Sequence, residues 1–189
     1  MSTETSVLNF KQFKKDLTRG QRFQDYCCML LWYMRKTPIC NFQSHDFQKF
    51  FGENLQMEEF KYDEQSMMSE NLFIETKERV SPHVDLHPAG IYAKDKPIKY
   101  TIGNYDEIWR FKRSKLVDLH RTGNYREIEV KNKETEVVTA KGFLLDKNKA
   151  NEICEDKLEN LSEKCMKYMP KEVQEIIKSN HKTNETTNQ

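Results

Sequence analysis

Carboxylates and a lysine alternate with apolar residues in the stretch 56–80, "QMEEFKYDEQSMMSENLFIETKERV". In a strand, residues i and i+2 share a face, so Glu59 and Lys61 would project together, and Glu75 would project from a second strand. If the two strands pair as a hairpin, Glu75 comes close to the first pair, and Glu53 joins them across a tight turn. Three carboxylates and one ammonium group would then converge.

Such a set suits the hydrolysis of a phosphodiester bond. Mg²⁺ takes carboxylate oxygens and keeps several waters, and Mn²⁺ is the expected substitute. Ions of this kind polarise the scissile phosphate and activate water, while a neighbouring lysine orients that water or neutralises developing charge. The predicted metal ligands are therefore Glu53, Glu59 and Glu75, and the predicted catalytic residues are Glu53, Glu59 and Lys61.

Glu-x-Lys is a weak signal when it is taken alone. It occurs at four places in a chain of which 32% is charged: Glu59/Lys61, Glu75/Lys77, Glu129/Lys131 and Glu155/Lys157. The alternative to a catalytic role for each copy is a solvent-exposed face of a strand or helix, where the charges form cross-strand pairs or are solvated. The first copy differs from the others because an acidic residue precedes it and a strand that carries a further acid follows it.

The elements that must position these residues follow from the hydrophobic pattern. Residues 6–19 and 20–36 predict two helices, of which the second ends before Pro38. Between about 39 and 145, short β-prone runs alternate with turns. Residues 149–179 return to helical periodicity.

This order of elements predicts an α/β (α+β) fold, with a central mixed β-sheet flanked by N-terminal and C-terminal helices. We expect one domain over residues 1–179, because a chain of 189 residues is long enough for one adequate core. Residues 180–189, "NHKTNETTNQ", have nothing apolar to bury, so a disordered tail is predicted there.

Composition excludes several function classes. The net charge is +1, from 31 basic and 30 acidic residues, so any attraction to nucleic acid must come from local patches. The longest apolar run, residues 26–34, is too short to cross a membrane, and no membrane partner is expected. The five cysteines have no zinc-binding spacing, which indicates reduced core thiols in a cytoplasmic protein.

The string around Glu59 carries a resemblance to a known family. "GENLQMEEFKYDEQSMMSENLFIETKER", followed by "AGIYAKDKPIKYTIGNYDEIWRF" and "TAKGFLLDKNKANEIC", resembles the restriction-endonuclease-like PD-(D/E)xK nucleases of phages and bacteria, over roughly residues 50–155. The resemblance implies a restriction-endonuclease-like core and a Mg²⁺-dependent deoxyribonuclease. In that pattern Glu53 is the leading acid, Glu59 and Lys61 are the E-x-K pair, and Glu75 is the acid of the second strand.

The sequence also departs from the family pattern. The leading acid is most often Asp, "SEN" stands where "GN" is usual, and "PAGI" replaces "SGI". Asp63, Asn71 and Gly90 match further positions, and Gln21 and Gln24 are candidates for a polar helix residue near the metal. These departures keep a second function class open, a catalytically inactive nuclease-fold protein that binds nucleic acid or a protein partner.

The basic run "RFKRSK" (110–115) interleaves cations with aromatic residues. Arg110, Lys112, Arg113 and Lys115 are therefore predicted to follow a DNA backbone. The alternative is a solvated sheet edge that resists aggregation. DNA is the expected partner, and a homodimer is expected because a compact nuclease that cuts both strands often dimerises.

Overall fold

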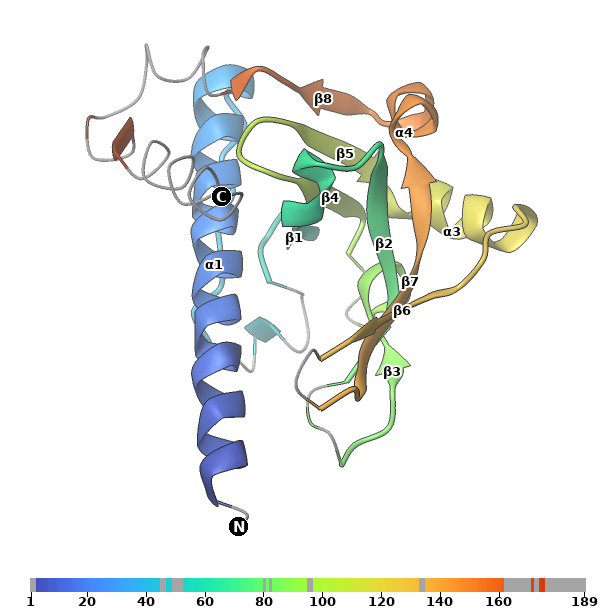
Figure 1. Ribbon diagram of the computed structural model, residues 1–189. Coiled ribbons are helices and arrows are strands. Elements are labelled where there is room, and N and C mark those ends of the chain that lie inside the picture. Colours follow the sequence, from blue (N-terminus) through green and yellow to red (C-terminus); the bar gives the residue numbers. More distant parts are fainter. Residues whose placement is uncertain are drawn as a thin grey trace.

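The computed structural model describes residues 3–44, 47–48, 53–79, 81, 83–94, 97–132, 135–161, 171 and 174–175, with side chains from Leu17 onward. Within these residues the fold is mixed α/β (Figure 1). Its helices are α1 (Thr3–Arg35), α3 (Arg113–Thr122) and α4 (Lys147–Ile153). Its strands are β1 (Glu58–Tyr62), β2 (Asn71–Glu78), β3 (His87–Pro88), β4 (Lys99–Gly103), β5 (Ile108–Lys112), β6 (Ile128–Lys131), β7 (Val138–Asp146) and β8 (Asp156–Leu158).

The strands form two sheets, where the sequence predicted one central sheet. The first has the order β1-β4-β5-β8 and is mixed, because β1 runs parallel to β4 while the other pairs are antiparallel. The second has the order β3-β2-β7-β6 and is antiparallel. The predicted hairpin between β1 and β2 is wrong, since β1 pairs with β4, and β2 pairs with β3 and β7.

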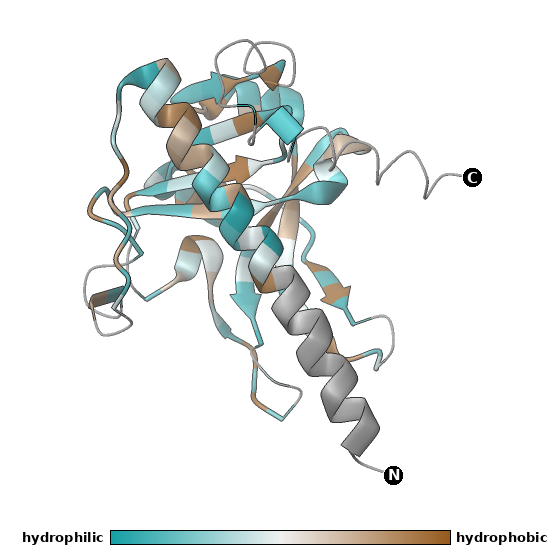
Figure 2. Ribbon diagram, turned by 90° about the vertical axis from the view of Figure 1, so that its left-hand side faces the viewer, coloured by the Kyte–Doolittle hydropathy of each residue, from teal (hydrophilic) through white to brown (hydrophobic). Residues whose placement is uncertain are grey.

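The long helix α1 packs against the first sheet (Figure 1). The buried side chains of Phe23, Tyr26 and Leu30 form one core with residues of β5 and β8, and Phe60 and Tyr62 of β1 pack against it. Figure 2 shows apolar residues in the half of α1 that lies over this sheet. A second core joins β2, β7, β4 and β5 with α3 and α4.

Several predicted boundaries differ from the observed ones. The two predicted N-terminal helices are one helix, in which Gly20 has no neighbouring atom within 4 Å of an added Cβ and so causes no break. Helix α3 and strand β8 were not predicted, and the 3₁₀ helix η2 (Gly90–Tyr92) lies within the region where only β-prone runs and turns were expected. Most of 162–179 and all of 180–189 lie outside the described residues.

Two predictions from composition can be compared with the structure. Of the described helices, none has the length and apolar character needed to cross a membrane. Cys27, Cys28, Cys40 and Cys154 are free thiols, but only Cys27 is a core residue as predicted, since Cys28 and Cys154 are half-buried and Cys40 is exposed; Cys165 lies outside the described residues. Cys27 is buried in the core under α1, which is the environment that the apolar run around it predicted.

Gly90 allows the chain to pass closely behind β2. Its φ is +52°, and a Cβ at this position would collide with the carbonyl group of Glu75. We expect Gly90→Ala to lower the free energy of unfolding by more than about 2 kcal/mol, because the left-handed conformation alone costs roughly 1–2 kcal/mol for a residue with a Cβ. Denaturation in urea measures this loss.

Gly20→Ala is the matched control for that measurement. Gly20 lies inside α1 with open space around it, so alanine is expected to raise stability by about 0.5–1 kcal/mol. Similar losses in the two variants would contradict the explanation for Gly90.

Candidate active site

Glu59, Lys61 and Glu75 meet in the structure. Lys61 Nζ lies 3.1 Å from Glu59 Oε1 and 2.7 Å from Glu75 Oε2. The three side chains are 11%, 30% and 15% exposed, in the order Glu59, Lys61, Glu75. The predicted convergence is therefore present, although β1 and β2 belong to different sheets and do not pair as a hairpin.

The alternation of β2 explains why Glu75 is available to Lys61. Leu72, Ile74 and Thr76 are buried, and Glu75 belongs to the alternate set of the strand. On β1, Glu59 lies in register with Tyr100 of β4, and Lys61 with Ile102. The period of two thus places Glu59 and Lys61 on one side of β1, and Glu75 on the side of β2 opposite Leu72, Ile74 and Thr76.

In the group formed by Glu59, Lys61 and Glu75, two carboxylates interact with a single ammonium group. Burial, opposed by Lys61, raises the pKa of Glu59 to about 7. Burial lowers the pKa of Lys61, but the charges of Glu75 and Glu59 outweigh it and hold that pKa well above its ordinary value. Glu59 Oε2 is buried without a hydrogen-bond partner among the described residues. The group therefore carries a surplus of negative charge once Glu59 is ionised.

Glu59 should make the stability of the fold depend on pH. Its pKa is raised from 4.5 to about 7, so the folded state binds more protons than the unfolded state between these values. Stability is then highest near the lower value and falls as pH rises towards 7, by roughly 3 kcal/mol at about 1.4 kcal/mol per pKa unit.

Glu59→Gln checks this dependence, since an amide cannot ionise. The free energy of unfolding is measured in urea at pH 5 and pH 8 for both proteins. The variant is expected to lose less stability than wild type across this interval. Parallel pH curves for wild type and variant would contradict the raised pKa.

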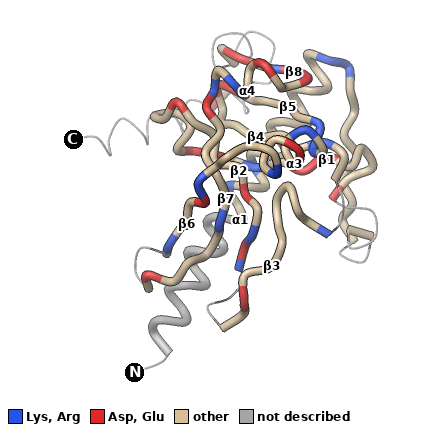
Figure 3. The backbone as a smooth tube through the Cα atoms, turned by 90° about the vertical axis from the view of Figure 1, so that its right-hand side faces the viewer, with Lys and Arg blue, Asp and Glu red and all other residues tan. Residues whose placement is uncertain are grey.

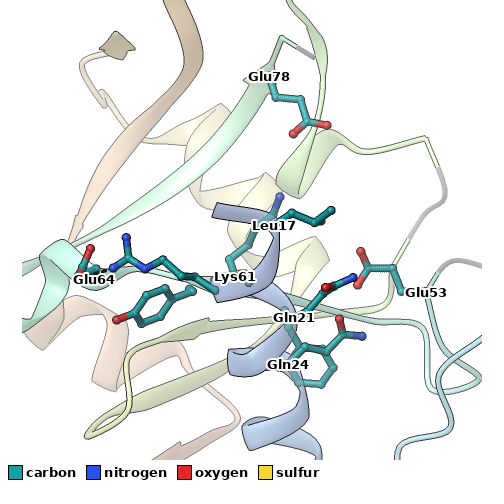
Figure 4. Close-up of a pocket in the computed structure, with 11 residues that line it drawn as sticks. Leu17, Gln21, Gln24, Glu53, Lys61, Glu64 and Glu78 are labelled. Atoms are coloured by element: carbon teal, nitrogen blue, oxygen red, sulfur yellow. Dashed lines mark ion pairs between the residues drawn. The ribbon is translucent and has the colours of Figure 1, made fainter. Parts of the chain in front are cut away.

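Glu53 lies on the wall of a cleft that opens above Lys61. The cleft has a volume of about 530 Å³ and lies between α1 and β1. Figure 4 shows Glu53 on the side of the cleft where Gln21 and Gln24 of α1 lie. The charge of Glu53 contributes to the raised pKa of Glu59, so the two carboxylates interact. Glu53, Gln21 and Gln24 therefore lie near the predicted metal site, whereas Glu59 and Glu75 contact Lys61 within it.

The predicted set of three metal ligands is only partly assembled. Within the described part of the chain, no three His, Cys, Asp or Glu side chains gather closely enough to hold a metal ion. Mg²⁺ in proteins is nevertheless often bound by one or two carboxylates, with water and substrate phosphate completing the coordination. Glu59, with its unpartnered buried oxygen, and Glu75 fit that requirement.

The four residues predicted to contact DNA have different environments. Arg110 is buried on β5, where its guanidinium group donates to both carboxylate oxygens of Glu58 at 2.8 Å. It therefore does not belong to a DNA-facing surface, because a central strand buries both of its faces. Arg113 donates to the carbonyl oxygens of Ile91 (2.6 Å) and Ala93 (3.0 Å), which anchors the loop around η2.

Lys112 and Lys115 are the two exposed members of the predicted DNA surface. Lys112 is 57% exposed and pairs with Glu155 at 3.3 Å, and Lys115 approaches the carbonyl oxygen of Ile153. Figure 3 shows basic and acidic residues interspersed along β2, β6 and β7. Lys141 of β7, for example, contacts Glu127 and Glu129 at 2.9 Å each. Local charge on these strands is largely compensated.

Two residues near the site have roles that the sequence did not reveal. Asp63, matched to a family acid, caps the 3₁₀ helix η1 (Glu64–Met67) and also accepts a hydrogen bond from the amide of Phe73 at 2.9 Å. Tyr100 is fully buried and interacts electrostatically with Glu59 and Lys61. The sequence "IKYTI" does not indicate that its tyrosine lies beside Glu59 and Lys61, because this proximity depends on the pairing of β4 with β1.

Comparison of the chain with protein-family models, with curated proteins and with solved structures found no match. The functional argument therefore depends on the residues of the site.

Proposed function

We propose that this protein is a divalent-metal-dependent nuclease that hydrolyses DNA phosphodiester bonds, and that its first sheet belongs to a restriction-endonuclease-like core. The observation that carries the proposal is the buried group formed by Glu59, Lys61 and Glu75. Two carboxylates face one ammonium group, with distances of 3.1 Å and 2.7 Å, and one carboxylate oxygen lacks a partner. Such a surplus of buried negative charge is costly unless a cation offsets it.

Each residue of this group has a distinct role in the proposal. Glu59 and Glu75 would hold Mg²⁺ or Mn²⁺, and Glu53 would contribute from the wall of the cleft. The bound ion would supply polarisation of the scissile phosphate and activation of water. Lys61 lines the cleft and keeps its ammonium charge because both carboxylates raise its pKa, so it can orient a water or neutralise charge on the phosphate.

The cleft supports a phosphate-containing substrate next to Lys61. Arg19, Gln21 and Gln24 of α1 line it together with residues of β1, and the carboxylates of Glu53, Glu64 and Glu78 also lie on its wall. Arg19 forms an ion pair with Glu64 and lies over the ring of Tyr62, 5.5 Å from its centroid. A cation, two amides and an aromatic face are groups that bind phosphates and bases. Lys112 and Lys115 remain candidates for more distant contacts with the DNA backbone, and a homodimer remains part of the proposal for cutting both strands.

The test is a cleavage assay with the purified protein. Supercoiled and linear DNA are incubated with Mg²⁺, with Mn²⁺ or with a chelator, and Glu59→Ala is compared with wild type. We expect cleavage that requires the metal and that Glu59→Ala reduces by orders of magnitude, because a lost metal ligand removes the ion's contribution to the transition state. Equal cleavage by both proteins, or none by wild type, would refute the proposal.

A second candidate function has one observation in its favour. Lys61 already lies between both carboxylates, and no three metal-ligating side chains meet in the described residues. Two carboxylates that already share an internal cation would suit a nuclease-fold protein that binds nucleic acid or a protein without cleaving it. Calorimetry separates the two functions. Salt-sensitive DNA binding without any heat of Mg²⁺ or Mn²⁺ binding would favour the inactive protein.

A further inference from the structure

A second, smaller cavity lies beside Lys61. Its volume is about 120 Å³, and its polar lining includes Lys61, Asp63, Glu75 and Tyr100. Lys61 and Tyr62 line this cavity and also the larger cleft. The side chain of Lys61 thus lies between a cleft with room for a substrate and a cavity with room for only small molecules.

The hydroxyl group of Tyr100 is an unexplained feature of this cavity. Tyr100 is 0% exposed, and its Oη makes no hydrogen bond of good geometry among the described residues, although the backbone of Glu75 lies close enough to act on its pKa. Buried polar atoms in proteins almost always have a partner, which is frequently an ordered water. A phenol keeps its proton at neutral pH, so this hydroxyl can donate as well as accept.

The other polar groups of the cavity differ in how many hydrogen bonds they still lack. Asp63 is already committed, since its two oxygens accept from the amides of Ser66 (3.2 Å) and Phe73 (2.9 Å). Lys61 has three donors, and contacts with Glu59 and Glu75 account for two of them. A third donor, a phenolic hydroxyl and a carboxylate therefore surround the same small volume.

We propose that this cavity holds ordered water, and that Tyr100 is a positioning residue which fixes Lys61 and Glu75 through that water. The positioning role rests on the proposed nuclease function. A water is retained where there is roughly 10–15 Å³ of space for its centre and where two to four polar partners are available. The cavity meets both conditions. Water bound to Tyr100 and Glu75 gives the third Lys61 donor a fixed partner, which determines how the ammonium group is presented to the cleft.

Two measurements on the full chain test the proposal. In a high-resolution crystal structure, we expect a water within hydrogen-bond distance of Tyr100 Oη, and Tyr100→Phe is expected to lose it or to displace Lys61. In the cleavage assay, Tyr100→Phe is expected to lower kcat roughly 10- to 100-fold with KM unchanged, as for partners that orient a catalytic group.

Tyr92→Phe is the matched control. Tyr92 has a partly buried hydroxyl, but its partner is His120 Nδ1 of α3 at 2.9 Å, so kcat should not change. A dry cavity in the crystal structure would overturn the water site and the positioning role together. Water in the cavity combined with equal kcat values for Tyr100→Phe and wild type would overturn the positioning role alone. Wild-type protein that cleaves no DNA would remove the nuclease function and the positioning role, and the crystal structure would still decide the water site.

Discussion

Replacing Lys61 with methionine is expected to lower metal-dependent DNA cleavage by roughly 10²- to 10³-fold, the usual loss when one preorganised charge-stabilising donor is removed. Methionine keeps an unbranched stem of similar length, so the variant removes the ammonium group and little else. That group is the sole cation within contact distance of both Glu59 and Glu75 in the described residues, at 3.1 Å and 2.7 Å. Rates measured with saturating Mn²⁺ and DNA separate this effect from weaker binding.

Lys131→Met is the control because Glu129 and Lys131 form another of the four Glu-x-Lys copies in the chain. Lys131 lies on β6, is 51% exposed, and approaches Glu136 only to 3.9 Å. Its loss should leave cleavage within twofold of wild type, an effect of order 0.5 kcal/mol or less. If both lysine variants cleave DNA at the wild-type rate, Lys61 has no part in catalysis.

Removing Arg110 is expected to produce the largest loss of stability, about 3–5 kcal/mol, because it leaves a buried charge without its partner. Glu58 is 2% exposed, and its carboxylate accepts from Arg110 Nε and Nη2 at 2.8 Å and from the hydroxyl of Thr101. Arg110 Nη1 also lies 3.5 Å from Asp156, which Arg35 at the end of α1 contacts at 2.7 Å. This chain of ion pairs crosses the sheet from β1 to β8 and reaches α1.

Urea denaturation of Arg110→Met measures the loss, and Arg121→Met, an exposed position on α3, serves as the control with an expected change within about 0.5 kcal/mol. The double variant Glu58→Leu/Arg110→Met gives a sharper result. It should recover much of the lost stability, because replacing both members of a buried pair by apolar groups removes the unpaired charge. A double variant less stable than Arg110→Met would contradict this account.

The sequence by itself determined the local order around the site. The period-two pattern placed Glu59 with Lys61 and separated Glu75 from the buried Leu72, Ile74 and Thr76, because successive residues of a strand point to opposite faces. It also ended α1 before Pro38, since proline disfavours helical backbone in the residue before it. These features depend on residues within a few positions of one another.

Only the tertiary structure decided which strands are neighbours. A strand pattern specifies faces but not pairing partners, so it could not reveal that β1 pairs with β4 and β2 with β7. The same missing information hid the position of β5 between β4 and β8, which turns Arg110 from a candidate DNA contact into a buried partner of Glu58. It also hid Tyr100, whose place beside Glu59 comes from the parallel register of β1 and β4. The role of each charged side chain in this protein therefore depends on which strands pair. Strand pairing decides how deeply the side chain is buried and which opposite charge it meets, and these two factors set the free energy of its ionised form.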